Sequence, residues 1–293
     1  MAVIEIQAKT ILATIQHPDE VFGMKYNMNL YRGCQHQCIY CDSRSQCYEI
    51  ENFNHDVLVK ANALELLEKE LPRKRLKGIV GTGSMNDPYM PLERQYDLTG
   101  RALEILARHH FGVHVTTKSD LVVRDAERLA AIHDRVQASV AFSISTADDE
   151  LSRKVEPGAP PTSARLRAMR ALAERGLPVG ACMMPILPFL EDTPENITAI
   201  VELAVQHGAS FIMPWFGMSM RDRQRDYFYA QLDRLFPGLR SRYEHVYGER
   251  YGCPVPNAKE LSSLFYDLCA RYGLQTHAPT YEPRHDPRQL TLF

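Results

Sequence analysis

The chain has 293 residues, of which 45% are hydrophobic and 24% charged, and its formal net charge is −2. This length predicts one large domain or a domain with an appendage, and the small net charge neither requires nor excludes a nucleic-acid partner. An odd number of cysteines, seven, and the lack of a charged-then-apolar leader in MAVIEIQAKT argue against a secreted disulfide framework. The longest apolar run, residues 181–190, is short and contains two prolines, so we expect no membrane span and a cytoplasmic protein with reduced thiols.

Short β-rich runs alternate with helical patterns along the first two thirds of the chain. The runs predict strands at 25–31, 78–82, 112–117, 138–145, 178–184 and 210–214. Apolar spacings of three and four predict helices at 57–71, 95–109, 124–133, 162–175 and 194–207. Thr193 followed by Pro194 is typical of a helix start, and Gly176 and Gly208 are typical of helix ends. This alternation predicts a parallel sheet, and six units are too few for a closed eight-fold barrel, so we predict an α/β partial (β/α)6 barrel.

The chain divides into an N-terminal segment (1–24), the barrel (25–215), a helical C-terminal region (216–276) and a flexible tail (277–293). Residues 221–251 mix seven arginines and five tyrosines with five acids. Arginine with interleaved aromatics suits phosphate contact and base stacking, whereas the balanced charge favours an amphipathic helix packed across the open edge of the barrel. The pattern NAKELSSLFYDLCARY at 257–272 predicts one more packed helix.

The loop after the first predicted strand contains the stretch YRGCQHQCIYCDSRSQC, which holds four of the seven cysteines. In a parallel barrel, the loops at the carboxyl ends of the strands carry the chemistry. A structural zinc needs four ligands, and neither Cys47 nor His36 completes a familiar zinc spacing. Iron–sulfur clusters are held by cysteine thiolates, normally four for a [4Fe–4S] centre. Three thiolates, from Cys34, Cys38 and Cys41, would leave one iron open to a ligand from outside the protein.

The spacing CxxxCxxC at the end of a first barrel strand resembles the radical S-adenosylmethionine (SAM) superfamily. Five blocks, NLYRGCQHQCIYCDSR, GTGSMNDPYMPLE, VTTKSDLVVRD, FSIST and VEPGAPPTSARLRAMRALAERGLPVGACMMPILP, resemble its spore photoproduct lyase-like branch, often described as DNA repair photolyase-related proteins. The resemblance covers about residues 25–215. It implies a [4Fe–4S] cluster whose open iron is chelated by SAM, and an external electron donor such as flavodoxin or ferredoxin. Reduction of the cluster would cleave SAM to a 5′-deoxyadenosyl radical, which abstracts hydrogen from a substrate.

The resemblance also implies cofactor contacts in the first loops. Tyr40 matches an aromatic position that approaches the SAM adenine, and an aromatic that only packs over the cluster is the alternative. Ser84, Asn86 and Asp87 follow the second predicted strand, where the superfamily binds the amino nitrogen of SAM. Short polar side chains can accept hydrogen bonds from an ammonium group, although Asn-Asp-Pro is also an ordinary turn signature.

Further contacts are expected at the ends of later strands. Lys118 closes the third predicted strand and suits the SAM carboxylate, whereas a solvated lysine is the usual alternative. Ser143 and Ser145 alternate on the fourth predicted strand, so both should face the barrel interior, and Ser143 matches a serine that contacts SAM. Glu156 and Arg165 belong to the last block, where they either contact the cofactor or pin the loop through an ion pair.

One position departs from the photoproduct lyases. Those enzymes place a cysteine after the second strand that returns hydrogen to the product radical, and alignment on Asp87 puts Ser84 at that position. An alcohol is a far poorer hydrogen-atom donor than a thiol, so Cys47, Cys182 and Cys253 remain as possible donors. Cys182 lies in an apolar strand and is predicted to be core, whereas Cys253, beside two prolines, is predicted to be a loop thiol with a catalytic role.

The resemblance and the Arg/Tyr segment favour a nucleic acid, DNA, as the substrate. The alternatives are a radical SAM enzyme that modifies a protein, an RNA or a small molecule, and a metal-stapled binding module without activity. The C-terminal QLTLF, residues 289–293, resembles the Gln-Leu-x-Leu-Phe motif with which bacterial polymerases and repair proteins dock on the sliding clamp. Its alternative is that Leu292 and Phe293 pack into a groove of their own barrel.

Overall fold

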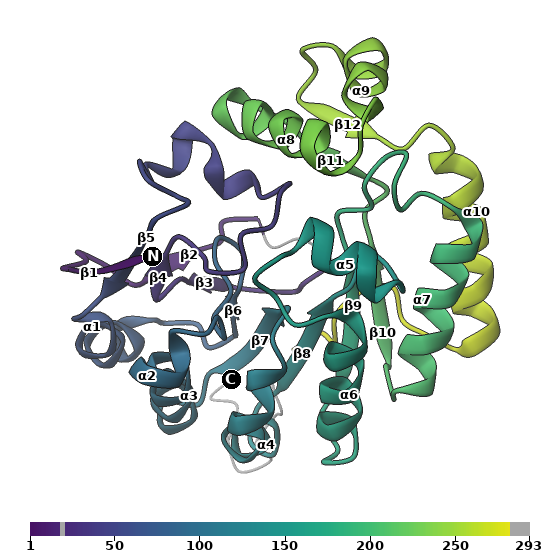
Figure 1. Ribbon diagram of the computed structural model, residues 1–293. Coiled ribbons are helices and arrows are strands. Elements are labelled where there is room, and N and C mark those ends of the chain that lie inside the picture. The colour runs from purple at the N-terminus through teal and green to yellow at the C-terminus, as the bar shows by residue number, and fades with distance from the viewer. Residues whose placement is uncertain (18–20, 282–293) are drawn as a thin grey trace.

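The computed structural model describes residues 1–17 and 21–281, and its main sheet is seven strands wide (Figure 1). In spatial order the strands are β10 (Phe211–Pro214), β9 (Val179–Met183), β8 (Ala138–Ser143), β7 (Gly112–Thr117), β6 (Ile79–Thr82), β3 (Tyr26–Met28) and β2 (Leu12–Thr14). From β10 to β3 all neighbouring strands are parallel, and β2 pairs antiparallel with β3. The sheet ends at β10 and β2 in the described part of the chain, which confirms the predicted partial (β/α)6 barrel.

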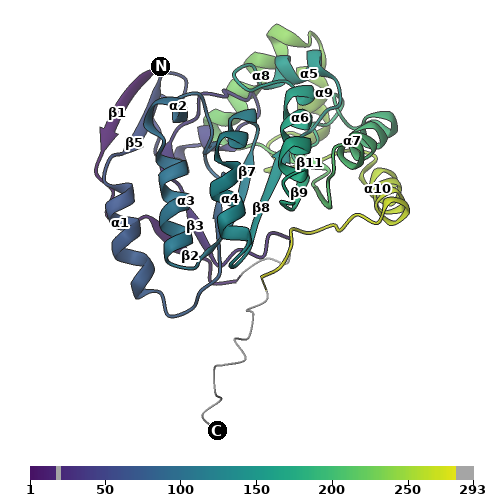
Figure 2. The ribbon, with the colours of Figure 1, turned by 90° about the horizontal axis from the view of Figure 1, so that it is seen from below.

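The helices that connect the parallel strands lie along the outside of the sheet (Figures 1 and 2). In chain order they are α1 (Ala63–Glu70), α3 (Leu98–Arg108), α4 (Ala126–His133), α6 (Thr162–Ala173) and α7 (Pro194–Gln206). Helix α7 begins where the sequence indicates, because the Thr193 side chain accepts a hydrogen bond from the N–H of Asn196 at 3.2 Å. Two short helices, α2 (Glu93–Tyr96) and α5 (Asp149–Val155), are not indicated by the sequence, since one or two turns carry little apolar periodicity.

The core lies between the sheet and these helices. Every residue of β6, β8 and β9 is buried, which explains why these strands read as continuous apolar runs rather than alternating ones. Four short 3-10 turns complete the connections: η1 (Asp42–Arg44), η2 (Gln46–Tyr48), η3 (Leu71–Arg73) and η4 (Asp120–Asp125). The first two belong to the cysteine-rich loop, so that loop has local structure of its own.

A second, three-stranded sheet corrects one predicted element. Its strands, in spatial order, are β1 (Ala2–Ile6), β5 (Asp56–Lys60) and β4 (Tyr31–Arg32). Strand β5 occupies the start of the helix predicted at 57–71, and the helix begins only at Ala63. The reason is local: Val57 and Val59 are fully buried and alternate with half-buried residues, which is the period of a strand built on β-branched side chains.

The C-terminal region consists of helices and a small two-stranded sheet. Strands β11 (Gly217–Ser219) and β12 (Gly252–Pro254) pair antiparallel, and α8 (Asp222–Leu235) and α9 (Leu239–Tyr247) lie between them in the chain. Figure 1 places α8 and α9 at the top of the molecule, above the end of the barrel that carries the cysteine-rich loop. Helix α10 (Ala258–Tyr272) packs along α7, so the packed helix predicted at 257–272 is confirmed.

The first residues of the predicted flexible tail pack on the barrel. Ala278 is fully buried, and its N–H donates to the carbonyl oxygen of Val21 at 2.7 Å. The clamp-like motif at 289–293 lies outside the described residues and stays a prediction, as do the segment boundaries at 24, 215 and 276. Among the described residues, none of the helices combines the length and the apolar character that crossing a lipid bilayer requires.

Candidate functional site

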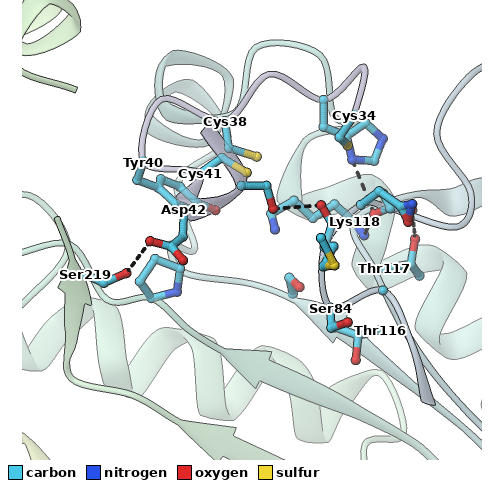
Figure 3. A pocket seen from close by; sticks show the side chains of 18 of the residues that line it. Cys34, Cys38, Tyr40, Cys41, Asp42, Ser84, Thr116, Thr117, Lys118 and Ser219 are labelled. Atoms are coloured by element: carbon cyan, nitrogen blue, oxygen red, sulfur yellow. Dashed lines mark hydrogen bonds and ion pairs between the residues drawn. The ribbon is translucent and has the colours of Figure 1, made fainter. Parts of the chain in front are cut away.

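The predicted cluster ligands lie together on the loop that follows β4 (Figure 3). Cys34 and Cys38 are buried, and Cys41 is half-buried. Gly33, directly before the first cysteine, has a φ of +81°, and a Cβ there would lie 2.7 Å from the carbonyl oxygen of Asp56. Glycine alone fits both the left-handed backbone and this close approach, so Gly33 sets the turn of the chain into the cysteine-rich loop.

Side chains from the loop itself hold its backbone in place. Gln37 Nε2 donates to the carbonyl oxygen of Cys34 at 2.7 Å, and Arg44 Nε donates to that of Cys38 at 3.4 Å. The Arg44 guanidinium also lies 3.6 Å from the ring centroid of Tyr227 in α8. The carbonyl groups beside the ligands are therefore hydrogen bonded by side chains of the same loop.

Helix α8 binds the outer side of the same loop. Arg223 Nη2 donates to the carbonyl oxygens of Ile50 at 2.7 Å and Ser45 at 3.3 Å, and Gln224 Nε2 donates to that of Tyr40 at 3.1 Å. The start of the Arg/Tyr segment is thus a packed helix, as one of the two interpretations expected. Its first arginines are held by the protein rather than solvated, however: Arg223 and Arg225 donate to carbonyl oxygens, and Arg221 pairs with Asp42 at 3.0 Å.

A cavity of about 230 Å³ opens beside the thiols, at the carboxyl ends of the barrel strands. All the predicted site residues line it except Ser145, Arg165 and Cys253; those present are Cys34, Cys38, Tyr40, Cys41, Ser84, Asn86, Asp87, Lys118 and Ser143. Trp215, the single tryptophan of the chain, also lines the cavity and is 46% exposed. Sequence reasoning missed Trp215, because a tryptophan after a sixth strand carries no signal of its own.

The donor set fits the predicted cluster. Burial raises the pKa of the Cys34 thiol to about 12, and it raises the pKa of Cys38 as well, so iron must displace protons when it binds. Among the described residues, no three His, Cys, Asp or Glu side chains are grouped closely enough to hold a single metal ion. A [4Fe–4S] cluster makes a different demand, because each thiolate binds a different iron, and three thiols on one loop meet it.

Asp87 connects the loop after β6 to β7 and to the cysteine-rich loop. It accepts hydrogen bonds from the Thr117 hydroxyl at 2.7 Å and the Lys118 N–H at 2.6 Å, and His36 Nδ1 lies 3.3 Å from its carboxylate. Burial alone would raise the pKa of Asp87, but His36 and these donors outweigh it and hold the pKa at about 2. The carboxylate is therefore charged and already has partners. His36 helps to fix the position of Asp87, a role that the sequence did not indicate.

Asn86 and Ser84 present polar groups to the cavity from the same loop. Asn86 lines the cavity, and its Nδ2 donates to the carbonyl oxygen of Tyr31 at 2.9 Å, which fixes the amide. Ser84 Oγ lies 3.2 Å from Asn27 Oδ1 in β3. Both residues are placed where an ammonium group in the cavity could reach an acceptor, as the sequence predicts.

Lys118 and Tyr40 reach the cavity above a buried carboxylate, Glu156. Tyr40 donates its hydroxyl hydrogen bond to Glu156, and Lys118 Nζ lies 3.8 Å from the same carboxylate. Burial would lower the pKa of Lys118, but the Cys38 sulfur and Glu156 outweigh it and raise the pKa, so the ammonium stays charged. At 3.8 Å the contact with Glu156 is too long for a hydrogen bond, and within the described residues the Lys118 ammonium donates no hydrogen bond.

Arg165 stands behind the cavity rather than in its wall. Its guanidinium pairs with Glu156 and donates to the carbonyl oxygens of Pro160 at 2.8 Å and Ser143 at 2.9 Å. It is 0% exposed, so it has no surface left for a cofactor. The predicted cofactor contact of Arg165 is therefore corrected: the ion pair pins the loop, which is the other interpretation of the Glu156 and Arg165 pair.

Ser145 is placed away from Ser143, although both were expected to face the barrel interior. Strand β8 ends at Ser143, so the alternation of strand side chains does not extend to Ser145. Ser145 Oγ instead donates to Glu191 Oε1 at 2.9 Å. Glu191 is fully buried and also accepts from the N–H of Leu187 at 2.8 Å, and burial raises its pKa to about 8.

We expect Glu191 to make folding stability depend on pH. Its pKa is raised from 4.5 to about 8 in the folded protein, so the unfolded chain releases the proton first. The stabilising contribution is therefore complete below pH 4.5 and is lost as the pH rises to about 8, by at most about 1.4 kcal/mol per pH unit. Urea unfolding of the wild type and Glu191→Gln at about pH 5 and about pH 8 measures this, because glutamine cannot ionise. If the free energies of unfolding of the wild type and of Glu191→Gln differ by the same amount at both pH values, Glu191 does not make stability depend on pH.

The cysteines outside the cluster motif differ in burial and in whether they line a cavity. Cys253 was expected in a loop, but it lies in β12, is 1% exposed and packs in a cluster with Met218 and Tyr247. It does not line the cavity, although its apolar cluster includes Cys38 and Met218, which do. Cys47 is exposed, with Arg221 Nη1 3.5 Å from its sulfur. Cys182 is buried, as predicted, yet it lines a second cavity that adjoins the first.

The chain is similar to known proteins in sequence and in fold. A family model described as the radical SAM superfamily matches residues 28–204. An uncharacterized protein of Mycobacterium tuberculosis is 32% identical over 279 residues, which cover 92% of this chain and 82% of that protein. A spore photoproduct lyase mutant with bound AdoMet and dinucleoside spore photoproduct has a TM-score of 0.69 at 15% identity, covering 92% of this chain and 79% of its own. A second similar structure is TsrM, a radical S-adenosylmethionine methyltransferase of Kitasatospora setae, with tryptophan substrate and a SAM analogue bound. Its TM-score is 0.54 at 14% identity, and the match covers 85% of this chain and 52% of the TsrM chain.

Proposed function

Because the chain belongs to the radical SAM superfamily, we propose that it is a radical SAM enzyme that repairs or modifies DNA. The family uses a [4Fe–4S] cluster and SAM, and the cysteine-rich loop and its cavity fit both. When bound, the reduced cluster cleaves SAM and so supplies a 5′-deoxyadenosyl radical that abstracts hydrogen from a substrate. An external one-electron donor such as flavodoxin or ferredoxin would reduce the cluster. The residues of this chain bind and orient these groups.

Each part of the cavity wall has a separate task in this proposal. Cys34, Cys38 and Cys41 would hold the cluster through their thiolates, and SAM would bind at its remaining open site. Lys118 binds the SAM carboxylate with its free N–H groups, while the oxygen of Asn86 accepts from the amino group. The buried ring of Tyr40 closes the cavity beside the cluster and keeps water from the reacting groups.

The observation that carries the choice of DNA is the fold shared with spore photoproduct lyase over 92% of the chain, in a structure that holds AdoMet and a dinucleoside lesion. The half-exposed indole of Trp215 at the cavity supports it, since exposed aromatics stack on bases without regard to sequence. A small-molecule substrate is the second candidate, because TsrM, of similar fold, was solved with tryptophan as its substrate. Ser84, in place of a cysteine, argues that the reaction differs from that of the photoproduct lyases.

Deuterium transfer tests this proposal. Purified protein is reconstituted with iron and sulfide without oxygen, reduced, and incubated with SAM and a perdeuterated substrate. We expect deuterium in 5′-deoxyadenosine with single-stranded or damaged DNA, and none with RNA, a peptide or tryptophan. If only RNA, a peptide or tryptophan transfers deuterium to 5′-deoxyadenosine, the proposal that DNA is the substrate is wrong.

We also expect Lys118→Ala to weaken SAM binding ten- to a hundred-fold. A hydrogen bond to a charged group contributes about 1.5–3 kcal/mol, and about 1.4 kcal/mol corresponds to a factor of ten. Since Trp215 is the single tryptophan and lines the cavity, its fluorescence reports the titration. Lys69→Ala, on an exposed helix face, is the matched control. Iron content should stay unchanged in both variants. If Lys118→Ala binds SAM with wild-type affinity, Lys118 does not bind the SAM carboxylate.

A further inference from the structure

A second cavity, of about 330 Å³, shares a wall with the first. Both are lined by residues at the ends of β6, β7 and β8: Gly83, Ser84, Thr116, Lys118 and Ser143. A group bound in the second cavity would therefore lie directly across this wall from the cofactor. Its volume falls near the lower end of the range for ligand sites, roughly 300–1,000 Å³.

The remaining wall of the second cavity combines apolar side chains with unsatisfied hydroxyls. Phe22, Met24 and Met184 supply the apolar part. Thr82 and Ser143 are 4% and 6% exposed, and neither hydroxyl is hydrogen bonded within the described residues. Because both residues line the cavity, their hydroxyls can be offered to a ligand that enters it, as donors or as acceptors.

The chemistry of the wall selects the kind of ligand. Its described lining holds no carboxylate, and Lys118 is the one cation, which it shares with the cofactor cavity. Asn27, whose amide nitrogen has no hydrogen-bond partner within the described residues, adds a donor, and Phe22 adds a flat ring. Such a wall suits an uncharged, flat heterocycle with donors and acceptors on its edge. A nucleobase has these properties, and enzymes that react on a base take it out of the stack into a pocket of this kind.

Cys182 brings a thiol to this cavity. It is paired with Ser143 across β8 and β9, and both line the same cavity. Burial raises the pKa of the Cys182 thiol to about 12, so the sulfur keeps its hydrogen at neutral pH. Of the described cysteines outside the cluster motif, Cys47 is exposed beside Arg221, and Cys253 and Cys269 are buried and line neither cavity.

We propose that the second cavity receives a nucleobase of the substrate and that Cys182 is the catalytic residue that donates a hydrogen atom to the substrate radical. This inference rests on the proposed function and names the reacting group within it. After a substrate C–H bond is broken, the carbon radical takes the hydrogen atom of the Cys182 S–H, so a C–H bond forms and a sulfur radical remains. One electron from the one-electron donor that reduces the cluster, together with one proton from water, restores the thiol.

A binding experiment tests the cavity without any turnover. Thymidine, deoxycytidine, deoxyadenosine and deoxyguanosine are titrated into the full-length protein by calorimetry. We expect at least one nucleoside to bind, and Thr82→Val and Asn27→Ala to weaken it about tenfold or more, since each removes a hydrogen-bonding partner at constant or smaller size. SAM affinity of the reconstituted variants, read from Trp215 fluorescence, should stay unchanged. Absence of binding by all four nucleosides, or full binding by both variants, would overturn the assignment of the cavity.

A solvent-deuterium experiment tests the thiol. In heavy water the Cys182 S–H becomes S–D, so the product formed from DNA should carry one solvent deuterium. Cys182→Ala and the nearly isosteric Cys182→Ser should lose that deuterium while 5′-deoxyadenosine still forms. Cys269→Ala is the control, because Cys269 is equally buried and burial raises its pKa to about 11, but it lies in α10.

The outcomes of the two proposals can be told apart. If DNA transfers no label to 5′-deoxyadenosine in the wild type, the proposed function itself fails. If DNA transfers label but the Cys182→Ala product still carries solvent deuterium, DNA remains the substrate and Cys182 is not the donor. Loss of solvent deuterium in Cys269→Ala as well would show a structural effect and would also overturn the role of Cys182.

Discussion

Replacement of Cys34, Cys38 or Cys41 by alanine is expected to abolish the cluster and, with it, all cleavage of SAM. Each thiolate would hold a different iron, and no other cysteine is among the described residues that line the cavity. Iron and sulfide content, the electron paramagnetic resonance signal of the reduced protein and the yield of 5′-deoxyadenosine measure the effect. Activity should fall to the background of the reaction without enzyme.

Cys47→Ala is the matched control for the three ligand variants. Cys47 belongs to the same loop but is exposed and does not line the cavity, so its loss should leave iron content and SAM cleavage intact. Loss of iron in Cys47→Ala together with retention in Cys41→Ala would refute the assignment of the ligands.

Arg165→Ala is expected to destabilise the protein by about 3–5 kcal/mol, the usual cost of removing one partner of a buried ion pair. The substitution leaves the carboxylate of Glu156 buried, and it also leaves the carbonyl oxygen of Ser143 without its donor. Lys118, at 3.8 Å, compensates only in part. Unfolding in urea, followed by circular dichroism, gives the change in free energy.

Two further variants separate the charge effect from a loss of packing. The double variant Glu156→Gln/Arg165→Met removes both charges at similar volume and should recover most of the lost stability. Arg167→Ala, an exposed position on the same helix, should change stability by no more than about 0.5 kcal/mol. Equal destabilisation in Arg165→Ala and in the double variant would mean that packing, not the ion pair, holds this loop.

The barrel and the cluster loop could be predicted from the sequence because both depend on local patterns. Buried parallel strands leave continuous apolar runs, and the helices between them carry periods of three and four. The cysteine spacing is shorter still, since three ligands of one cluster lie within eight residues. Lys118 and Ser143 both line the cavity, because strand ends in a parallel barrel meet at one edge, and their contacts with SAM stay a prediction.

The rest of the site depends on contacts that no local pattern encodes. Arg165 and Glu156 suit a cofactor and an ion pair equally well until burial decides between them. Cys253 looks like a loop thiol beside its prolines, but its pairing with Met218, far earlier in the chain, buries it in a strand. Cys182 was correctly predicted to be buried, yet an apolar strand does not reveal that one of its side chains borders a cavity.

The order in which the chain is synthesised gives the packing of α8 a consequence for cofactor loading. Arg223 and Gln224 supply hydrogen bonds to the carbonyl groups of Ile50 and Tyr40, which lie 173 and 184 residues earlier in the chain. A nascent chain on the ribosome that has not yet released α8 therefore presents the cysteines on a loop whose carbonyls lack these donors. The loop's own side chains hold the carbonyl groups of Cys34 and Cys38, but α8 holds those of Tyr40 and Ile50, so we expect chains that end before α8 to retain less iron than the full chain.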